Sequence, residues 1–439
     1  MRAEWLCGTL GELCRAVFSG GTPTSTNAAY YGGSIPWLRT KEVNYAKVYT
    51  TEICISQVGL DASSAKLVPI NSVIVAMYGN GDTAGRVAIN KVPLTTNQAC
   101  CNLVIDASKA DYRFVYYYLK SQYQKLVDLK NGGAQQNLNG RLIRDFPIAV
   151  PELATQVEIG NFLEALDDRI ALLRETNATL EAIAQALFKS WFVDFDPVRA
   201  KSQAQAPAGM DEATAALFPD EVEVSAHGLL PRGWRYMPVG DVVEGIYDGP
   251  HATPPESEEG AVFLGIKNLT GTGLDLGDVR HIAESDFGQW TRRVLPAAGD
   301  IVFSYEATLG FFALVPPGLR CCLGRRLALI RPRSDVGDGH FFFHQFIAAP
   351  FQRLLEKHTI QGATVNRIAL KQFPSYVVMD PPAEVKAAFD TTAAAIWARI
   401  HANQAQALSL TEIRDTLLPR LISGQLRLPQ ADAIAEKMR

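Results

Sequence analysis

The sequence repeats itself once, at a distance of 226 to 230 residues. Trp37 and Lys41 in IPWLRTKEVN correspond to Phe263 and Lys267 in FLGIKNLT. Further matches, such as FVYYYL with FFFHQF and a later Phe-Pro dipeptide with its second copy, follow in the same order through both halves. A period this long predicts two similar domains in one chain and excludes the short-period stacks of solenoid proteins.

Each copy begins with a globular pattern rich in Gly, Pro, Thr and aromatic residues. Short β-type runs separated by turn signals, together with one helical stretch, predict a mixed α+β domain. The predicted strands include Ser72–Met77, Cys101–Ile105, Ile301–Tyr305 and Arg326–Ile330, and the predicted helices are Tyr112–Leu129 and His340–Lys357.

A long helix is predicted at the end of each copy, over about Thr155–Phe195 and Ala383–Ile422. Apolar residues there recur in steps of three and four, which is the heptad pattern of a coiled-coil seam. The first seam runs through Ile159, Leu163, Leu166, Ile170, Leu173, Asn177, Leu180, Ala184, Leu187 and Trp191, and the second through Ile396, Ile400, Asn403, Ala407, Leu410, Ile413, Leu417 and Leu421. Neither helix can bury its seam alone, so we expect the two to pack on each other as an antiparallel pair.

The expected fold class is therefore α+β, with two similar mixed α/β domains held apart by an antiparallel two-helix coiled-coil spacer in a pseudo-twofold arrangement. The expected boundaries are 1–150 and 231–380 for the two heads, 151–196 and 381–426 for the spacer helices, 197–230 for an acidic, proline-containing linker, and 427–439 for a C-terminal tail. Asn177 and Asn403 interrupt the seams near the helix midpoints. Because antiparallel helices place their midpoints side by side, the two amides are predicted to pair and to disfavour slipped registers.

The composition is that of a globular protein, with 439 residues of which 47% are hydrophobic and 20% charged. The absence of a long apolar run or a signal-peptide pattern predicts a cytoplasmic location. Seven cysteines without CxxC spacing predict reduced thiols and no metal site. The net charge is −4, yet residues 1–150 carry 15 Lys and Arg against 10 Asp and Glu, and residues 320–371 carry 9 against 3. Such local basic surfaces suit a polyanion.

Catalytic motifs are missing from the sequence. There is no GxxxxGK[ST] phosphate loop, no GxGxxG after a strand, no HExxH and no GxSxG. Met379-Asp380-Pro381-Pro382 resembles the start of the box that holds adenine in amino-methyltransferases, but Ala383 stands where that box has an aromatic residue. We therefore expect no catalytic residue in this chain.

Polar loops are the candidate binding elements, and the internal twofold repeat points to duplex DNA, which has the same symmetry. Hydroxyls beside glycines can approach phosphates, amides can bond base edges in pairs, and Arg and Lys bind phosphate or guanine. The candidates are Ser19, Gly20, Gly21, Thr22, Arg39, Lys41, Gln135, Gln136, Asn137, Asn139 and Arg141 in the first head, and Lys267, Asn268, Arg325, Arg326, Thr364, Asn366 and Arg367 in the second. Solvated turns and ordinary surface charges are the alternative interpretations of each.

Over essentially its whole length the chain resembles the specificity (S) subunits of type I restriction-modification systems. The resemblance is carried by SGGTP followed by IPW, by the GAQQNLN loop, by ALFKSWFVDFDP at the end of the first helix and by LLPRLISGQL at the end of the second. It implies that each head recognises one half of a split DNA target, and that the helices fix the half-site separation and dock two methyltransferase (M) subunits. The side chains expected at this M-subunit and spacer interface are Phe188, Trp191, Phe192, Leu417, Leu418 and Leu421.

The resemblance also implies what this subunit leaves to its partners. The M subunits bind S-adenosylmethionine and methylate an adenine in each half-site, and restriction (R) subunits bring ATP and Mg for cleavage, so the chain itself is expected to bind no cofactor. In the second head, DGPHATPPESE replaces SGGTP poorly, which leaves its loop contacts open. A methyltransferase-only or orphan system and an autonomous DNA-binding regulator are the alternatives.

Overall fold

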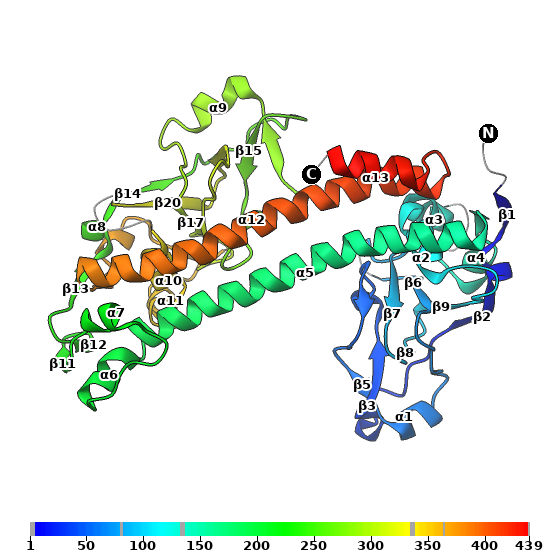
Figure 1. The fold of residues 1–439 in the computed structure, drawn as a ribbon, viewed down its shortest axis with the longest axis horizontal. Helices are drawn as coiled ribbons and strands as arrows, with labels where there is room; N and C mark the ends of the chain where they lie inside the picture. The colour runs from blue at the N-terminus through cyan, green and yellow to red at the C-terminus, as the bar shows by residue number, and fades with distance from the viewer. Residues whose placement is uncertain (1–4, 80–81, 132–136, 334–338, 363–364, 438–439) are drawn as a thin grey trace. The chain divides into compact units, whose positions relative to one another are not determined.

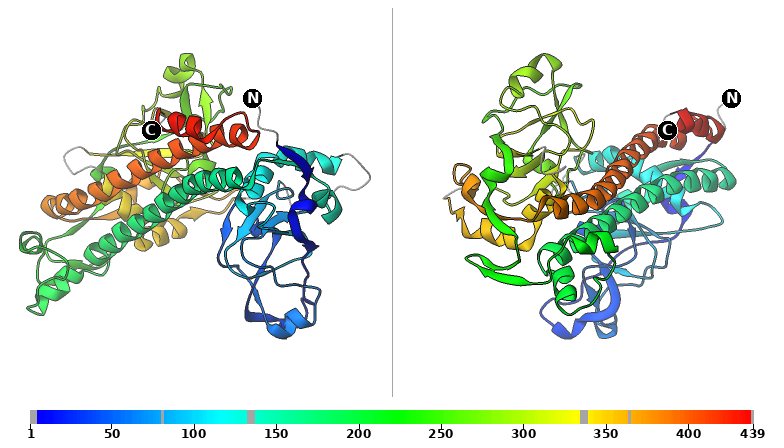
Figure 2. Two further views of the ribbon diagram at one scale, coloured as in Figure 1. Left: turned by 45° about the vertical axis from the view of Figure 1, so that its right-hand side comes forward. Right: turned by 60° about the vertical axis from the view of Figure 1, so that its left-hand side comes forward.

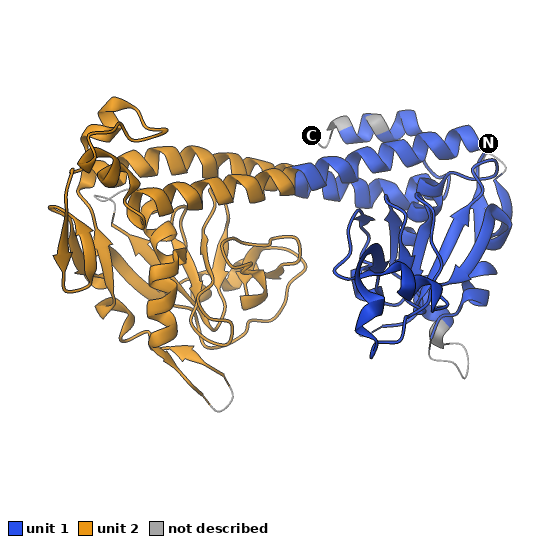
Figure 3. Cartoon of the chain, turned by 90° about the horizontal axis from the view of Figure 1, so that it is seen from below, with its two compact units in different colours: residues 1–172, 407–439 blue, residues 173–406 orange. Residues whose placement is uncertain are grey.

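The computed structural model describes residues 5–79, 82–131, 137–333, 339–362 and 365–437. The chain divides into two compact units, unit 1 (residues 1–172 and 407–439) and unit 2 (residues 173–406), which Figure 3 distinguishes by colour. Each unit holds one head and one half of each of two long helices, α5 (Leu153–Phe192) and α12 (Ala383–Ile422).

Unit 1 is built around a five-stranded sheet with the strand order β2-β9-β6-β7-β4 (Figure 1). Its strands are β2 (Cys14–Ser19), β4 (Lys47–Val48), β6 (Val73–Ala76), β7 (Val87–Asn90) and β9 (Cys100–Ile105). Neighbouring strands are antiparallel except β4, which runs parallel to β7. The near-continuous apolar sequence of β6 and β7 explains why both strands are buried along their whole length.

Shorter elements complete unit 1. The strands are β1 (Leu6–Thr9) with β10 (Pro147–Val150), and β3 (Tyr31–Leu38) between β5 (Cys54–Ile55) and β8 (Thr95–Thr96). The helices are α1 (Gln57–Asp61), α2 (Tyr112–Ser121), α3 (Tyr123–Asn131), α4 (Gly140–Arg144) and α13 (Leu428–Lys437), with 3-10 turns at Leu10–Leu13, Ala28–Tyr30 and Thr40–Glu42. The segment expected to be a C-terminal tail thus forms α13, which buries Ala431.

Unit 2 contains the second head, whose main sheet has the strand order β14-β20-β17-β18. Those strands are β14 (Val243–Asp248), β17 (Ile301–Ser304), β18 (Phe312–Leu314) and β20 (Leu327–Pro332). Smaller sheets join β15 (Ala261–Leu264) to β16 (Arg280–Ile282) and β19 (Cys321–Leu323), β13 (Arg235–Pro238) to β23 (Val377–Asp380), β11 (Val222–Ser225) to β12 (Gly228–Pro231), and β21 (Thr359–Ile360) to β22 (Arg367–Ile368). The helices are α6 (Asp196–Ser202), α7 (Glu212–Ala216), α8 (Val239–Val242), α9 (Glu284–Trp290), α10 (His340–Ile347) and α11 (Ala349–Lys357), with 3-10 turns at Ile266–Asn268 and Phe373–Ser375.

The two heads share one strand pattern, which confirms the predicted repeat. Strands β2, β9, β6 and β7 of the first head correspond to β14, β20, β17 and β18 of the second. Even an irregularity is shared, because the register shifts near the start of both β2 and β14. The predicted helix of each head is present but broken in two, and in the second head Pro350 stands in the first turn of the second piece, where its missing N–H is tolerated.

Within each unit the halves of α5 and α12 lie side by side and bury most of the predicted seam (Figures 1 and 2). In unit 1 the buried seam residues are Ile159, Leu163, Leu166 and Ile170 on α5 and Ala407, Leu410, Ile413, Leu417 and Leu421 on α12. In unit 2 the predicted seam residues Leu180, Leu187 and Ile396 are only half-buried, whereas their chain neighbours Phe188 and Trp397 are buried. The larger indole fills space against the second head, where it lies 5.1 Å from the ring of Phe343.

The segment expected to be a linker, residues 197–230, is folded. It contains α6, α7, β11 and most of β12. Its Phe218 is 1% exposed and lies 5.3 Å from the ring of Trp191 and 6.1 Å from that of Trp234. The prolines and acidic residues predicted a linker, but one buried aromatic side chain anchors the segment in the core of unit 2.

Among the described residues, none of the helices combines the length and the apolar character that crossing a lipid bilayer requires. In the same part of the chain, no three His, Cys, Asp or Glu side chains come together as ligands for a metal ion.

Candidate nucleic-acid interface

The glycine turn of the first head follows β2 and is held inside the head. Gly20 donates its N–H to the carbonyl of Cys100 at 3.1 Å, and Gly21 donates to the carbonyl of Thr96 at 2.8 Å. A side chain on either glycine would lie 2.1 or 2.2 Å from a neighbouring backbone atom. Close packing therefore explains both buried glycines, and the turn offers a ligand the residues that flank them.

Those flanking residues, Ser19 and Thr22, are exposed. The Thr22 hydroxyl donates a hydrogen bond to the side-chain oxygen of Gln98, and the Lys66 ammonium lies 5.8 Å from the centre of the Phe18 ring. Gln98 and Lys66 are both exposed. Sequence reasoning missed them because they are distant in the chain, and the fold places them beside the predicted turn.

Arg39 and Lys41 share one carboxylate. Arg39 Nη2 and Lys41 Nζ each lie 2.5 Å from Glu52 Oε2. The hydrogen bond from Lys41 and the charges of both cations lower the pKa of Glu52 below its usual value. Because the carboxylate offsets part of their charge, these two cations attract a phosphate less strongly than unpaired ones would.

The amide-rich loop of the first head is only partly described. Gln135 and Gln136 lie outside the described residues, so their predicted contacts stay predictions. Asn137 is exposed, as the prediction requires. Asn139 Oδ1 instead accepts hydrogen bonds from two N–H groups in the first turn of α4, both at 3.0 Å, and so caps that helix.

Arg141 follows the cap and is the most open cation of this loop. Its side chain is 90% exposed, and the nearest carboxylate, that of Asp145, is 3.6 Å away. Helix α4 lies against β2, since a side chain on Gly140 would be 3.9 Å from Ser19 Oγ. The predicted turn and the described end of the predicted loop therefore meet on one surface of the first head, with Arg141 beside them.

The second head repeats the first hydrogen bond of the glycine turn despite its different sequence. Gly249 donates its N–H to the carbonyl of Leu327 at 2.9 Å, as Gly20 does in the first head. Asp248 precedes it and binds Arg293 Nη1 at 2.5 Å and His251 Nε2 at 2.9 Å. The DGPH segment thus reproduces this bond while replacing the hydroxyls of the turn by an ion pair.

Lys267 and Asn268 of the second head have local partners. Lys267 Nζ lies 2.7 Å from Asp278 and remains half exposed. Asn268 is 2% exposed. Its Oδ1 accepts from the N–H of Gly265 at 2.9 Å, and its Nδ2 donates to the carbonyls of Asp275 and Asp278 at 3.0 Å. This corrects the prediction that Asn268 contacts DNA, because its amide is buried and bound to its own loop.

Arg325 and Arg326 lie in the turn between β19 and β20. Arg325 is exposed. Arg326 has the left-handed backbone angle φ of 75°, and its Nε lies 4.0 Å from a carboxylate oxygen of Glu306. Of the two, Arg325 is the better placed for a ligand.

The loop of the second head that matches the amide-rich loop is also only partly described. Thr364 lies outside the described residues. Asn366 Oδ1 accepts a long hydrogen bond of 3.4 Å from the N–H of Gly362, and Arg367 is exposed at the start of β22. Their predicted DNA contacts stay predictions.

The predicted asparagine pair is present in unit 2. Asn403 Nδ2 donates to Asn177 Oδ1 at 2.8 Å, and Asn177 Nδ2 donates to the carbonyl of Ile400 at 3.2 Å. The two side chains are 2% and 8% exposed. The pairing is confirmed, and its role in setting the register stays a prediction.

The six apolar side chains expected at the M-subunit interface are buried inside their own units. They are Phe188, Trp191 and Phe192 in unit 2 and Leu417, Leu418 and Leu421 in unit 1, and none is more than 8% exposed. In unit 2, Phe192 packs 4.9 Å from the ring of Phe341. This corrects the M-subunit part of the prediction, because side chains this buried offer no surface to another subunit, whereas Leu417 and Leu421 do pack in the helix seam as the spacer part requires.

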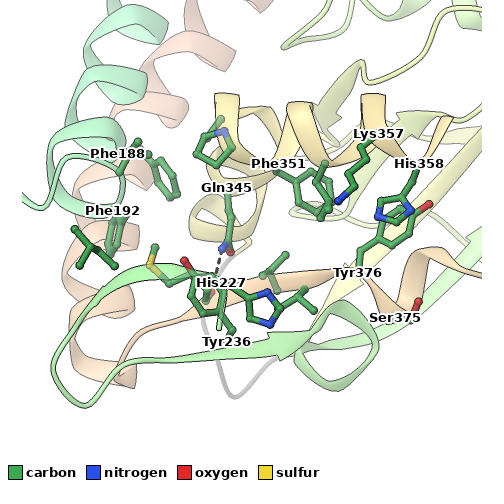
Figure 4. A pocket seen from close by; sticks show the side chains of 18 of the residues that line it. Phe188, Phe192, His227, Tyr236, Gln345, Phe351, Lys357, His358, Ser375 and Tyr376 are labelled. Carbon is green, nitrogen blue, oxygen red and sulfur yellow. Dashed lines mark hydrogen bonds between the residues drawn. The ribbon is translucent and has the colours of Figure 1, made fainter. Parts of the chain in front are cut away.

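A cavity of about 940 Å³ opens in unit 2 beside Phe188 and Phe192 (Figure 4). Its lining combines apolar side chains, such as Phe351 and Leu354 of α11, with polar ones, such as His227, Lys357 and His358. Gln345 Nε2 donates to the carbonyl of Met379 at 3.0 Å, whereas Gln345 Oε1 and the Tyr376 hydroxyl have no hydrogen-bond partner among the described residues. The described residues that are predicted to contact DNA do not line this cavity, so we place the candidate interface on the loops.

The chain is similar to known proteins over its first head and over most of its whole length. Residues 3–182 match the family model described as type I restriction modification DNA specificity domain. The type I restriction enzyme MjaIX specificity subunit of Methanocaldococcus jannaschii is 26% identical over 94% of this chain and 92% of its own length. The HindI specificity subunit of Haemophilus influenzae is also 26% identical, over 70% of this chain and 74% of its own.

A similar fold has been solved. The crystal structure of a type I restriction-modification system S subunit from M. genitalium covers 96% of this chain and 96% of its own length, with a TM-score of 0.58 and 16% identity. At that identity the similarity concerns the fold.

Proposed function

Because this chain is similar to type I restriction enzyme specificity subunits over most of its length, we propose that it belongs to their family, that each of its heads reads one half of a split DNA target and that the chain catalyses no reaction itself. The observation that supports this proposal most directly is the duplication. One chain carries two heads with the same strand order and with a buried glycine that makes the same hydrogen bond. Two similar surfaces in one chain suit two half-sites.

In the first head, the proposed reading surface is the area where the turn after β2 meets the start of α4. Ser19, Thr22, Asn137 and Arg141 are exposed there. Hydroxyls and a cation suit the phosphate backbone, and an amide suits base edges.

We further propose that α5 and α12 set the separation of the half-sites and dock two M subunits, with R subunits added for restriction. S-adenosylmethionine would then be held by the M subunits, and ATP and Mg by the R subunits. The buried seam residues cannot form the docking surface. Leu172, Ile183 and Leu408 on the two helices are 41–52% exposed and are better candidates.

Methylome sequencing tests the proposal. A strain that lacks adenine methylation would express this chain together with its M subunit, and a matched strain would express the M subunit alone. We expect methylated adenines in one bipartite motif with a fixed, non-specific spacer, and only when both proteins are present. A contiguous motif, or the same methylation without this chain, would contradict the proposal.

A further inference from the structure

The turn that precedes β9 in the first head has the same backbone hydrogen bonds as the turn that precedes β20 in the second. Four bonds correspond in donor, acceptor and order along the chain. In each bond below, the N–H of the first residue donates to the carbonyl of the second, and the bond of the first head is given before its equivalent in the second head. The pairs are Asn97 to Leu38 and Gly324 to Leu264 (2.9 and 2.7 Å), Cys100 to Asn97 and Leu327 to Gly324 (3.1 and 3.3 Å), Gly20 to Cys100 and Gly249 to Leu327 (3.1 and 2.9 Å), and Met77 to Ala99 and Tyr305 to Arg326 (2.8 and 3.1 Å). The two turns are therefore the same structure, built twice.

This correspondence pairs Gln98 with Arg325. Each stands one residue after the N–H donor of the first bond and two residues before the strand begins. In both turns this residue is exposed, while the residues next to it are buried or half-buried. The fold thus presents one long polar side chain at an equivalent point of each head, and the two side chains differ in chemistry.

The neighbours of Gln98 leave its amide available to a ligand. Thr22 donates a hydrogen bond to Gln98 Oε1 and so restrains the amide. An amide oxygen has a second lone pair, and the nitrogen has two donors, so the amide can still accept one bond and donate another. That is the pattern with which glutamine recognises adenine, whereas arginine donates two bonds to guanine.

We propose that Gln98 and Arg325 are equivalent specificity-determining residues, with Gln98 reading an adenine in the half-site of the first head and Arg325 a guanine in that of the second. This inference rests on the proposed function. Thr22 acts as a positioning residue for Gln98. The inference goes beyond the loops indicated by the sequence, because it adds Gln98 and assigns a base to each head.

Exchanging the two side chains tests the inference in the complex with the M subunit. The variants are Gln98→Arg, Arg325→Gln and, as a matched control, Gln124→Arg at an exposed glutamine on α3. Methylome sequencing of each strain would show the target. We expect Gln98→Arg to favour guanine over adenine at one position of one half-site, Arg325→Gln to make the reciprocal change in the other half-site, and each to change base discrimination roughly tenfold or more. The control should keep the original motif.

If Gln98→Arg abolishes methylation, the variant Gln98→Ala tests the inference in its place. Relaxed discrimination at a single position of one half-site supports the inference, and an unchanged motif overturns it. Unchanged motifs in both exchange variants, or a change in the half-site read by the other head, also overturn it. In these cases the unaltered chain still directs methylation of a bipartite motif, so the proposed function would stand. Only a failure of the unaltered chain to direct a bipartite motif would count against the function itself.

Discussion

In unit 1, Asp167 of α5 accepts a hydrogen bond from the Tyr117 hydroxyl at 2.8 Å and lies 2.7 Å from Arg414 of α12. At the corresponding position of unit 2, His344 replaces Tyr117, and its ring lies 5.3 Å from that of Phe389. Two copies of one fold are thus attached to their helices by different forces.

The attachment in unit 1 is ionic over more than one turn of helix. Glu164 of α5 lies 2.8 Å from Lys47, 3.4 Å from Arg113 and 3.6 Å from Lys91. Burial alone would raise the pKa of Glu164. The hydrogen bonds from Lys47 and Arg113 and the charges of Lys47 and Lys91 outweigh burial, so the pKa of Glu164 is lowered. Such a contact weakens with salt and with acid.

The attachment in unit 2 is mainly aromatic, with one buried ion pair between Lys386 of α12 and Asp380 of β23. Phe188 and Phe192 of α5 lie 5.5 and 5.4 Å from the ring of Phe389 of α12, and both pack on Phe341 of the head. Burial of rings depends little on ionic strength. The duplicated fold fixes where head and helix meet, while the side chains determine whether salt or acid weakens the contact.

Removing one ring tests the aromatic attachment and has the largest expected effect. Phe389→Ala leaves a cavity in a fully buried cluster and should lower the free energy of unfolding of unit 2 by about 3–5 kcal/mol. Hydrogen exchange followed by mass spectrometry would resolve the loss in peptides of unit 2. Ile183→Ala, at a half-exposed position of the same unit, is the control and should change little. An equally small effect of both would show that the aromatic cluster does not hold the head.

Acid should loosen unit 2 before unit 1. Burial lowers the pKa of His344 from 6.5 to about 4. Between these two values the unfolded chain binds a proton that the folded unit does not, so the free energy of unfolding falls as the pH falls, by about 3 kcal/mol in total. His401 contributes in the same direction. In unit 1, the stabilisation that the ionised Glu164 contributes to the free energy of unfolding is lost only below its ordinary pKa of 4.5.

Hydrogen exchange between pH 7.5 and 4.5, corrected for the intrinsic pH dependence of exchange, measures which unit loses stability first as the pH falls. His344→Phe should remove most of the slope from unit 2, and His251→Phe, at an exposed histidine, should leave it unchanged. If the stability of unit 2 depends on pH as strongly in His344→Phe as in the unaltered chain, another group is responsible for that dependence.

Removing one carboxylate tests the ionic attachment. Asp167→Ala leaves the Tyr117 hydroxyl without its partner and Arg414 with Asp415 alone, and should lower the free energy of unfolding of unit 1 by about 2 kcal/mol at low salt. The loss should shrink as salt rises, because screening weakens the contact in the unaltered chain as well. The matched variant Asp168→Ala removes a mostly exposed carboxylate and should have less effect. A loss that does not depend on salt would argue against an ionic attachment.

The smallest effect concerns the neutral pair across the seam of unit 2. In a double-mutant cycle, Asn177→Leu and Asn403→Leu should each destabilise unit 2, while the double variant should be milder than their sum by about 1 kcal/mol. Urea unfolding at two salt concentrations gives the coupling energy, which should not change with salt. Additive losses would show that the two amides act independently.

The repeat and the helices could be predicted from the sequence because they rest on periodicity. Heptad steps located α5 and α12 to within a few residues, and the position of each asparagine near its helix midpoint predicted a contact between residues 226 positions apart. These features follow from local spacing and symmetry, which a sequence displays directly.

Most errors concern side chains whose role depends on distant partners. A run such as Phe188 to Phe192 looks the same whether it packs on another subunit or on its own head, and only the fold decides. Asn268 likewise gave no sign that its amide would be bound by its own loop. Asn139 did carry a signal, because an asparagine followed by a short helical pattern is a typical N-cap.

The central claim is that the two heads read their half-sites separately, and exchanging a head tests it most directly. Residues 1–150 would be replaced by the corresponding head of a type I restriction enzyme specificity subunit, and the target of the complex with the M subunit would be determined by methylome sequencing. The account predicts that one half of the bipartite motif changes while the other half keeps its sequence. A change in both halves, or in neither, would contradict it.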